Sequence, residues 1–196
     1  MKQELRRQQT TQLLLDTTKA LIAEKGCESI TMKDIMDRSG LSKGAIFHYV
    51  KSKDEIFAWV LQDGLNIVNQ HFYDRVKQSK NFEGPLEAIT SGFSELENPG
   101  NVMNQILVYL LGKSGIPEID EVLKQFYEQS VRQSREWIAS GQQHGVIPLS
   151  VDKDKSGELF VLLALGLRMR AFLPAHNPSF QMNDYIQFLK DTLQRD

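Results

Sequence analysis

The sequence lacks several features that secreted, membrane and disulfide-bonded proteins have. It holds one cysteine, Cys27, in 196 residues, so no disulfide can form within the chain, and we expect a reducing compartment. No apolar run approaches the roughly 18 residues that a membrane span needs, and the early run of three leucines is too short for a signal-peptide core. We therefore expect a cytoplasmic protein with no membrane partner.

Motifs of catalysis are also missing. The sequence has no GxSxG, no glycine loop that could hold a phosphate and no HExxH, and its four histidines are scattered without the spacing of metal ligands. Asp152 and Asp154 lack the rest of a calcium loop and lie where a helix is predicted to start. We therefore predict that the protein is not an enzyme and has no catalytic residues, metal or cofactor.

Charge is unevenly distributed along the chain. The net charge is −2, with 24% charged and 41% hydrophobic residues, as in an ordinary globular protein. Residues 1–53 hold ten Lys or Arg and six acids, whereas the remaining residues hold thirteen and nineteen. A basic N-terminal part on an acidic body suits a protein that binds DNA with one domain only.

One stretch near the N-terminus, TMKDIMDRSGLSKGAIFHYVKSK, starts at Thr31 and is marked by helix-capping residues. Thr31, Ser42 and Ser52 each precede a helical pattern, and a hydroxyl at the N-cap accepts a bond from a free backbone N–H. Asp34 and Glu55, three residues after Thr31 and Ser52, complete predicted capping boxes. The pattern predicts two short helices and the start of a third.

Gly40 lies where the first of these helices must stop, and glycine adopts the left-handed turn conformation easily. Ile35, Leu41 and Ile46 are the expected core contacts, so the pattern predicts a helix-turn-helix. In that motif the N-terminal residues of the second helix face the base edges of DNA. The residues predicted to face DNA are Thr31, Lys33, Ser42, Lys43, Gly44, Ala45, Phe47, His48, Tyr49 and Lys53.

Three alternatives remain open from the residues alone. A helical hairpin that binds no ligand, or a helical adaptor that binds only protein, would carry the same caps, because capping boxes are common. An adaptor would not need Lys43, Gly44 and Lys53 around the start of a helix. An all-helical enzyme is the third alternative, although it has no motif to support it.

The segment from Leu14 to Ile56 resembles the N-terminal domain of the TetR family of transcriptional regulators. The family pattern is a helix ending in glycine, a Thr-capped helix, then G-[VL]-S-x-G-x-[IL]-Y-x-[HY]-F and a lysine opening a long helix. Here the central part reads GLSKGAIFHYV and is followed by Lys53. Phe47 replaces the family tyrosine and Val50 the closing phenylalanine, so we expect Tyr49 to carry the phosphate contact alone.

The rest of the chain is predicted to be helical, which gives an all-α fold of about nine helices. The domains are predicted at 1–52, a DNA-binding helix-turn-helix domain, and 53–196, a helical domain for ligand binding and dimerisation that shares the helix from 53. The predicted helices cover about 8–25, 31–39, 42–49, a long segment from Ser52, 85–96, 102–112, 117–143, 152–173 and 180–194.

The resemblance implies a homodimer that binds a palindromic double-stranded DNA operator, most simply as a repressor, and a small-molecule effector that releases it. In the family the middle helices enclose the effector and the last two pair across a two-fold axis. The matching effector candidates are Trp59, Phe93, Met103, Leu107, Phe126, Tyr127, Trp137, Leu165 and Arg168. The matching interface candidates are Leu159, Leu162, Leu163, Gly166, Met169, Phe188, Leu189 and Leu193.

Overall fold

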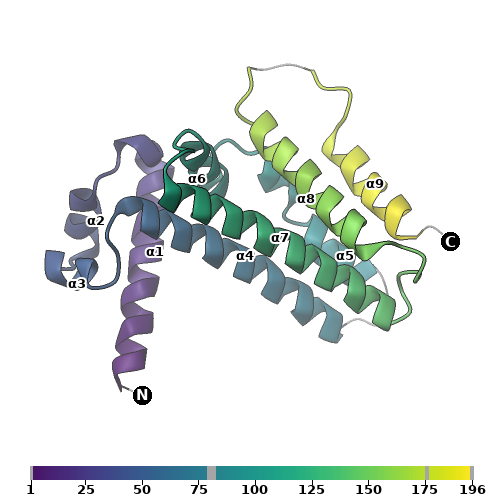
Figure 1. The fold of residues 1–196 in the computed structure, drawn as a ribbon, viewed down its shortest axis with the longest axis horizontal. Helices are drawn as coiled ribbons and strands as arrows, with labels where there is room; N and C mark the ends of the chain where they lie inside the picture. The colour runs from purple at the N-terminus through teal and green to yellow at the C-terminus, as the bar shows by residue number, and fades with distance from the viewer. Residues whose placement is uncertain (1, 79–82, 175–176, 195–196) are drawn as a thin grey trace. The chain divides into compact units, whose positions relative to one another are not determined.

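The computed structural model describes residues 2–78, 83–174 and 177–194, and in these residues every regular element is a helix (Figure 1). The all-α fold predicted from the sequence is confirmed. The helices are α1 (Lys2–Ser29), α2 (Met32–Ser39), α3 (Lys43–Phe47), α4 (Lys53–Gln78), α5 (Glu83–Thr90), the 3-10 helix η1 (Phe93–Glu97), α6 (Val102–Leu111), α7 (Pro117–Gln143), α8 (Lys153–Arg170) and α9 (Met182–Leu193).

Two predicted helices differ from the structure. The first helix begins at Lys2 rather than near residue 8. Its regular helical geometry stops at Gly26, as predicted, because Gly26 has φ 73° and ψ 162°. A further turn then runs to Ser29. The helix predicted over 85–96 is two elements, α5 and the 3-10 helix η1, with Ser91 and Gly92 between them.

The chain forms two compact units. The first unit comprises Met1–Gly64 and Gly100–Leu123, and the second comprises Leu65–Pro99 and Lys124–Asp196. The helices α4 and α7 therefore each supply residues to both units. The domain boundary predicted after residue 52 stays a prediction.

The first unit is built around α1, which packs against α2 and α6. Its core is formed by side chains that are almost completely buried, because each helix turns one apolar stripe inward. These side chains are Leu14, Ile22, Ile30, Ile35, Ile46, Val50, Ile56, Phe57, Ile106 and Leu110. The helix-turn-helix thus shares its core with α6, which lies more than 50 residues further along the chain.

The second unit has its own core, formed by α7, α8, α9 and η1. Its members include Leu96, Ile138, Phe160 and Tyr185. The buried Tyr185 hydroxyl donates a 2.8 Å hydrogen bond to the Phe160 carbonyl, which satisfies both groups. An apolar core with a paired polar group is the arrangement expected of a stable helical unit.

In the described part of the chain, no helix is both long enough and apolar enough to cross a membrane.

Candidate nucleic-acid interface

The start of α2 is fixed by the predicted capping box. The Thr31 hydroxyl accepts from the Asp34 N–H at 3.2 Å, and the Asp34 carboxylate accepts from the Thr31 N–H at 2.8 Å. The Thr31 hydroxyl also donates to that carboxylate, and the Lys25 ammonium lies 2.9 Å from it. These bonds, with the Thr31 hydroxyl bond the strongest, hold the pKa of Asp34 well below its usual range.

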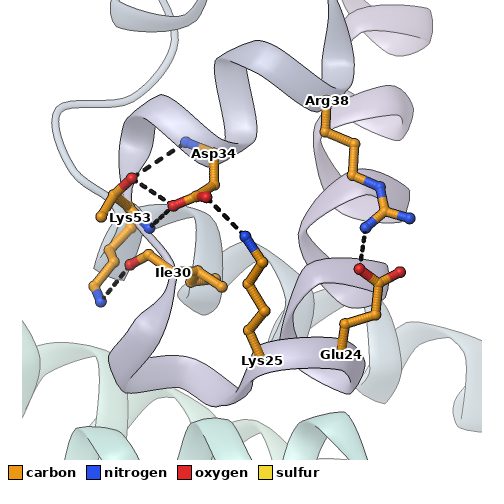
Figure 2. Close-up of polar contacts among 7 residues, drawn as sticks. Glu24, Lys25, Ile30, Asp34, Arg38 and Lys53 are labelled. Atoms are coloured by element: carbon orange, nitrogen blue, oxygen red, sulfur yellow. Dashed lines mark hydrogen bonds and ion pairs between the residues drawn. The ribbon is translucent and has the colours of Figure 1, made fainter.

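Two ion pairs join α2 to α1 (Figure 2). Lys25 pairs with Asp34, and Arg38 pairs with Glu24 at 2.5 Å. The Arg38 guanidinium lowers the pKa of Glu24 through a side-chain hydrogen bond. Exposed ion pairs contribute little free energy individually, so their main effect is to orient α2 on α1.

The turn between α2 and α3 has the geometry that glycine permits. Gly40 has φ 69°, and its N–H donates to the Met36 carbonyl at 3.0 Å. Ser42 then caps α3 by accepting from the Ala45 N–H at 3.2 Å. Ile46 is buried in the core of the first unit, so the opposite face of α3 is turned to solvent.

That outward face holds most of the residues predicted to contact DNA. Thr31, Lys33, Ser42, Lys43, Gly44, Phe47 and His48 are exposed, whereas Ala45, Tyr49 and Lys53 are half-buried. The Phe47 ring is 42% exposed, and the Lys43 ammonium lies 5.7 Å from its centroid. The His48 and Tyr49 rings meet edge to face with 5.0 Å between their centroids. The structure therefore presents a cation and a glycine at the start of α3, and three rings at its end and directly after it.

Val50, which replaces the phenylalanine of the resembling pattern, is buried in the core. Its role is packing rather than contact with a ligand.

Lys53 is placed differently from the other predicted contacts. Its ammonium lies 2.9 Å from the Cys27 carbonyl oxygen, 2.9 Å from that of Ile30 and 3.4 Å from that of Glu28. Figure 2 shows the side chain pointing toward Ile30. Its predicted contact with DNA stays a prediction.

The cap of α4 also differs in part from the predicted capping box. The Ser52 hydroxyl accepts from the Glu55 N–H at 3.3 Å, as expected. The Glu55 carboxylate, however, accepts from the Lys51 N–H at 2.7 Å, one residue before the predicted donor.

A polar cluster at the start of α4 was not predicted from the sequence. The Tyr109 hydroxyl donates to the Asp54 carboxylate at 3.0 Å, and the Lys113 ammonium lies 2.8 Å from the same carboxylate. Lys113 also donates to the Tyr109 hydroxyl. Burial, which is the largest cause, raises the pKa of Tyr109. No sequence signal marks this cluster, because Asp54 and Tyr109 are 55 residues apart.

Effector candidates are divided between the two units. Trp59, Met103 and Leu107 lie in the first unit; Phe93, Phe126, Tyr127, Trp137, Leu165 and Arg168 lie in the second. The prediction that they line one pocket stays a prediction.

Several of these candidates have defined partners in the second unit. Trp137 stacks on Phe72 with 5.1 Å between centroids and donates to the Asn69 side chain at 2.8 Å. The Tyr127 hydroxyl donates to Glu158 at 2.8 Å. Burial lowers the pKa of Arg168 to about 10.

An open hollow of about 470 Å³ in the second unit is lined by polar residues that are not among the effector candidates. These residues are His71, Asp74, Arg75, Gln78, Glu87 and Ser91.

Interface candidates fall into two groups. Leu159, Leu162 and Phe188 are exposed, with Leu162 at 51%, and Gly166 is exposed beside the half-buried Leu163 and Met169. Leu189 and Leu193 are only 4% and 6% exposed and belong to the core of the second unit. A side chain that its own chain covers offers no surface to a partner, so these two are left out of the interface proposed below.

Neither a metal site nor a reactive thiol emerges from the described residues. No group of three or more His, Cys, Asp or Glu is placed in them so that it could hold a metal ion. Cys27 is buried, and this burial raises the pKa of its thiol to about 12. A thiol with so high a pKa is almost entirely protonated near neutral pH and reacts slowly.

The helix-turn-helix region of this chain is similar to that of known transcriptional regulators. A family model described as "Bacterial regulatory proteins, tetR family" matches residues 14–60. A helix-turn-helix transcriptional regulator of Bacillus subtilis, YfiR, is 36% identical over 53 residues, which are 27% of this chain and 26% of that protein. The repressor KstR2 of Mycolicibacterium smegmatis is 25% identical over 150 residues, 74% of this chain and 69% of that protein.

The fold of the whole chain is also found among solved structures. A TetR-family regulator from Syntrophomonas wolfei superimposes with a TM-score of 0.70 over 94% of this chain and 95% of that one, at 19% identity. At that identity the likeness concerns the fold alone, and it extends over both units.

Proposed function

This chain belongs to the TetR family of helix-turn-helix transcriptional regulators rather than to an enzyme family, and we propose that it represses transcription in the cytoplasm. As a homodimer it binds a palindromic operator, and a small-molecule effector releases it. The family membership fixes the class of protein. The operator, the dimer and the effector are the proposal.

One observation carries the proposal of DNA binding, namely the way α3 is presented. Ser42 caps the helix, Ile46 anchors it in the core, and Lys43 and Gly44 are exposed at its N-terminus. In a helix-turn-helix this end of the second helix enters the major groove. The absence of a side chain at Gly44 lets the backbone approach a duplex closely, and the Lys43 ammonium can bind a phosphate or a guanine edge.

The proposed interface for DNA consists of residues on and beside α3. It includes every residue predicted from the sequence to face DNA except Lys53. These residues are Thr31, Lys33, Ser42, Lys43, Gly44, Ala45, Phe47, His48 and Tyr49. We expect His48 to read bases, Tyr49 to contact a phosphate, and the Lys43 ammonium to contact both a phosphate and a base edge. A protein-only adaptor, the alternative, would not place a lysine and a glycine together at an exposed helix start.

The exposed face of α8 and α9 supports the homodimer. Leu159, Leu162 and Phe188 are large apolar side chains left at the surface of the second unit, and Gly166 offers close approach. Apolar surface of this kind marks contact sites in soluble proteins. Two copies would place two α3 helices one or more turns of DNA apart, about 34 Å, which multiplies specificity.

The effector acts by shifting the equilibrium between two dimer conformations, one that spans the operator and one that does not. An effector that binds the second conformation more tightly lowers the affinity for the operator. It can lower this affinity only by as much as its own affinities for the two conformations differ. Half-buried aromatic side chains of the second unit, such as Phe93, Tyr127 and Trp137, suit a mostly apolar ligand.

Selection from random duplexes, followed by fluorescence anisotropy at several salt concentrations, tests the proposal. We expect a palindromic site and a steep loss of affinity with salt, because bound phosphates release counterions. The variant Lys43→Met should weaken binding, whereas Lys124→Met, which removes the same charge from the exposed surface of α7, should not. If the wild type binds no duplex even at low salt, the proposal fails.

The effector is tested separately. Compounds are screened for a rise in melting temperature, and operator affinity is then measured with each hit. A ligand that stabilises the protein and leaves operator affinity unchanged would contradict release by an effector.

A further inference from the structure

The carbonyl oxygens at the end of α1 have a single side-chain cation as their partner. The Lys53 ammonium lies within 2.9 Å of the Cys27 and Ile30 carbonyl oxygens and within 3.4 Å of that of Glu28. The last carbonyls of a helix have no partner within the helix, and a positive charge there also interacts favourably with the helix dipole. An ammonium has three N–H groups, and here three carbonyl oxygens lie within their reach.

Two aromatic rings flank the same ammonium. Its nitrogen is 5.1 Å from the centroid of the Tyr109 ring and 5.9 Å from that of Phe57. Both distances lie within the range of a cation–π interaction. Phe57 and Tyr109 are buried and meet edge to face at 5.3 Å, so the rings cannot move aside freely. Lys53 therefore joins the end of α1, the start of α4 and the ring on α6.

A phosphate contact would require this arrangement to break. To reach a duplex, the ammonium would have to leave the Cys27 and Ile30 carbonyls and both rings. Ile30 directly precedes Thr31, the N-cap of α2, so the carbonyl that would be released adjoins the helix-turn-helix. The bonds that hold Lys53 inward thus also hold the segment that sets the position of α2.

We propose that Lys53 is a positioning residue for DNA binding and not a phosphate contact. It fixes the link between α1 and α2 against the start of α4, and so presents α3 in the geometry that binds the operator. This inference rests on the proposed DNA binding, although its structural part can be tested without DNA.

The salt dependence of binding separates the two roles. A residue that neutralises one phosphate contributes about 0.9 to the slope of log affinity against log salt. We expect Lys53→Met to weaken operator binding by roughly five-fold or more with the slope unchanged, because it disturbs geometry and not charge neutralisation. Lys43→Met should instead lower the slope by about 1.8, which is about 0.9 for each of the two protomers of the bound dimer. Lys124→Met is the matched control and should change neither affinity nor slope.

Affinities are measured at low temperature, where circular dichroism shows each variant to be folded. Loss of stability alone would then leave affinity intact, whereas a positioning role lowers it. Lys53→Arg, which keeps the charge and the donors, should recover part of the affinity. If Lys53→Met does not fold, Lys53→Gln replaces it.

The outcomes are distinct. A slope lowered by about 1.8 in Lys53→Met, as in Lys43→Met, would overturn the inference and leave the proposed function standing. A wild type that binds no duplex would instead overturn the proposed function. The structural part is then decided by thermal unfolding, in which Lys53→Met should melt roughly 3 °C or more below Lys124→Met. Equal melting temperatures would overturn that part as well.

Discussion

The Tyr109 hydroxyl of α6 donates a 3.0 Å hydrogen bond to the Asp54 carboxylate of α4. Tyr109 is buried, and Lys113 binds both partners. The bond connects the first turn of the helix that follows the helix-turn-helix with the helix that packs on α1. Because the Tyr109 side chain is buried and the Asp54 side chain is partly buried, the bond is expected to matter more than a fully exposed contact.

Tyr109→Phe should lower the free energy of unfolding by about 1 kcal/mol, because it removes the hydroxyl and keeps the ring. Urea denaturation measures this change. Tyr127→Phe is the matched control: it removes a hydroxyl bonded to Glu158 at a more exposed place, and its effect should be smaller. Equal losses in the two variants would contradict a special role for the Tyr109 bond.

Phe47→Tyr should tighten operator binding. The Phe47 ring is exposed on α3, so an added hydroxyl meets solvent in the free protein and can donate to a phosphate in the complex. One such bond, worth about 1 kcal/mol, corresponds to roughly five-fold in affinity. Anisotropy titrations check this, with Phe180→Tyr as the control because that ring is equally exposed in the second unit. No gain in Phe47→Tyr would place the ring away from the phosphates.

Gly64→Ala should stabilise a Met103→Ala background more than it stabilises the wild type. An added Cβ at Gly64 would lie 2.3 Å from the Met103 sulfur, so the methionine has to move. Without that sulfur the only remaining effect is the helix propensity of alanine, a gain of about 1 kcal/mol. A double-mutant cycle by urea unfolding measures the difference between the two changes in unfolding free energy. Equal changes in both backgrounds would show that the close approach has no energetic effect.

Gly157→Ala and Gly166→Ala should behave oppositely, although both lie in α8. A Cβ at Gly157 would lie 3.1 Å from the Arg135 backbone nitrogen, which cannot rotate away, and we expect a loss of about 1–3 kcal/mol. A Cβ at Gly166 would meet nothing within 4 Å in its own chain, so the helix should be at least as stable.

Gly166→Ala should nevertheless weaken the proposed dimer, because the added methyl group would stand between two closely packed copies. Leu162→Glu should abolish the dimer. Sedimentation at several concentrations measures both effects. An unchanged dimer in Leu162→Glu would place the interface elsewhere.

Acid should remove the contribution of the α2 cap. The pKa of Asp34 is depressed by its bonds with Thr31 and Lys25, so the carboxylate stabilises the folded state fully above the ordinary aspartate pKa of about 3.9. That contribution is lost as the pH falls through the lower folded-state pKa. The difference in unfolding free energy between the wild type and Asp34→Asn should therefore shrink below about pH 4. Urea unfolding from pH 7 to pH 3 measures it, and a constant difference would contradict the assignment.

Local signals made most of the helices predictable. The caps at Thr31, Ser42 and Asp152 act on N–H groups two or three residues away, so sequence spacing alone identifies them. Pro117 opens α7 for another local reason, because proline has a helical φ and lacks an N–H that the first turn would leave unpaired. The Ser52 cap shows the limit of this reasoning, because the Glu55 carboxylate can reach the Lys51 N–H as easily as the expected one.

Contacts between distant residues were not predictable. The sequence shows that Lys53 is charged and follows the motif, but its carbonyl partners lie 23–26 residues earlier in the chain. Likewise, the apolar pattern of the last helix shows that Leu189 and Leu193 face something apolar, but not that this is their own core. The direction of the side chain determines both the partners of Lys53 and the burial of Leu189 and Leu193. A single sequence does not contain that direction.

The thiol of Cys27 lies on the residue whose carbonyl Lys53 binds, and it is 5% exposed. Since Cys27 is the single cysteine of the chain, a thiol reagent can label one place only. Labelling requires the end of α1 to open, so its rate under native conditions reports how often that end comes apart. Cys27 is thus an intrinsic probe of the contact between the end of α1 and Lys53. Comparing its labelling rates with and without a bound duplex measures how far DNA protects this contact, and no cysteine needs to be introduced.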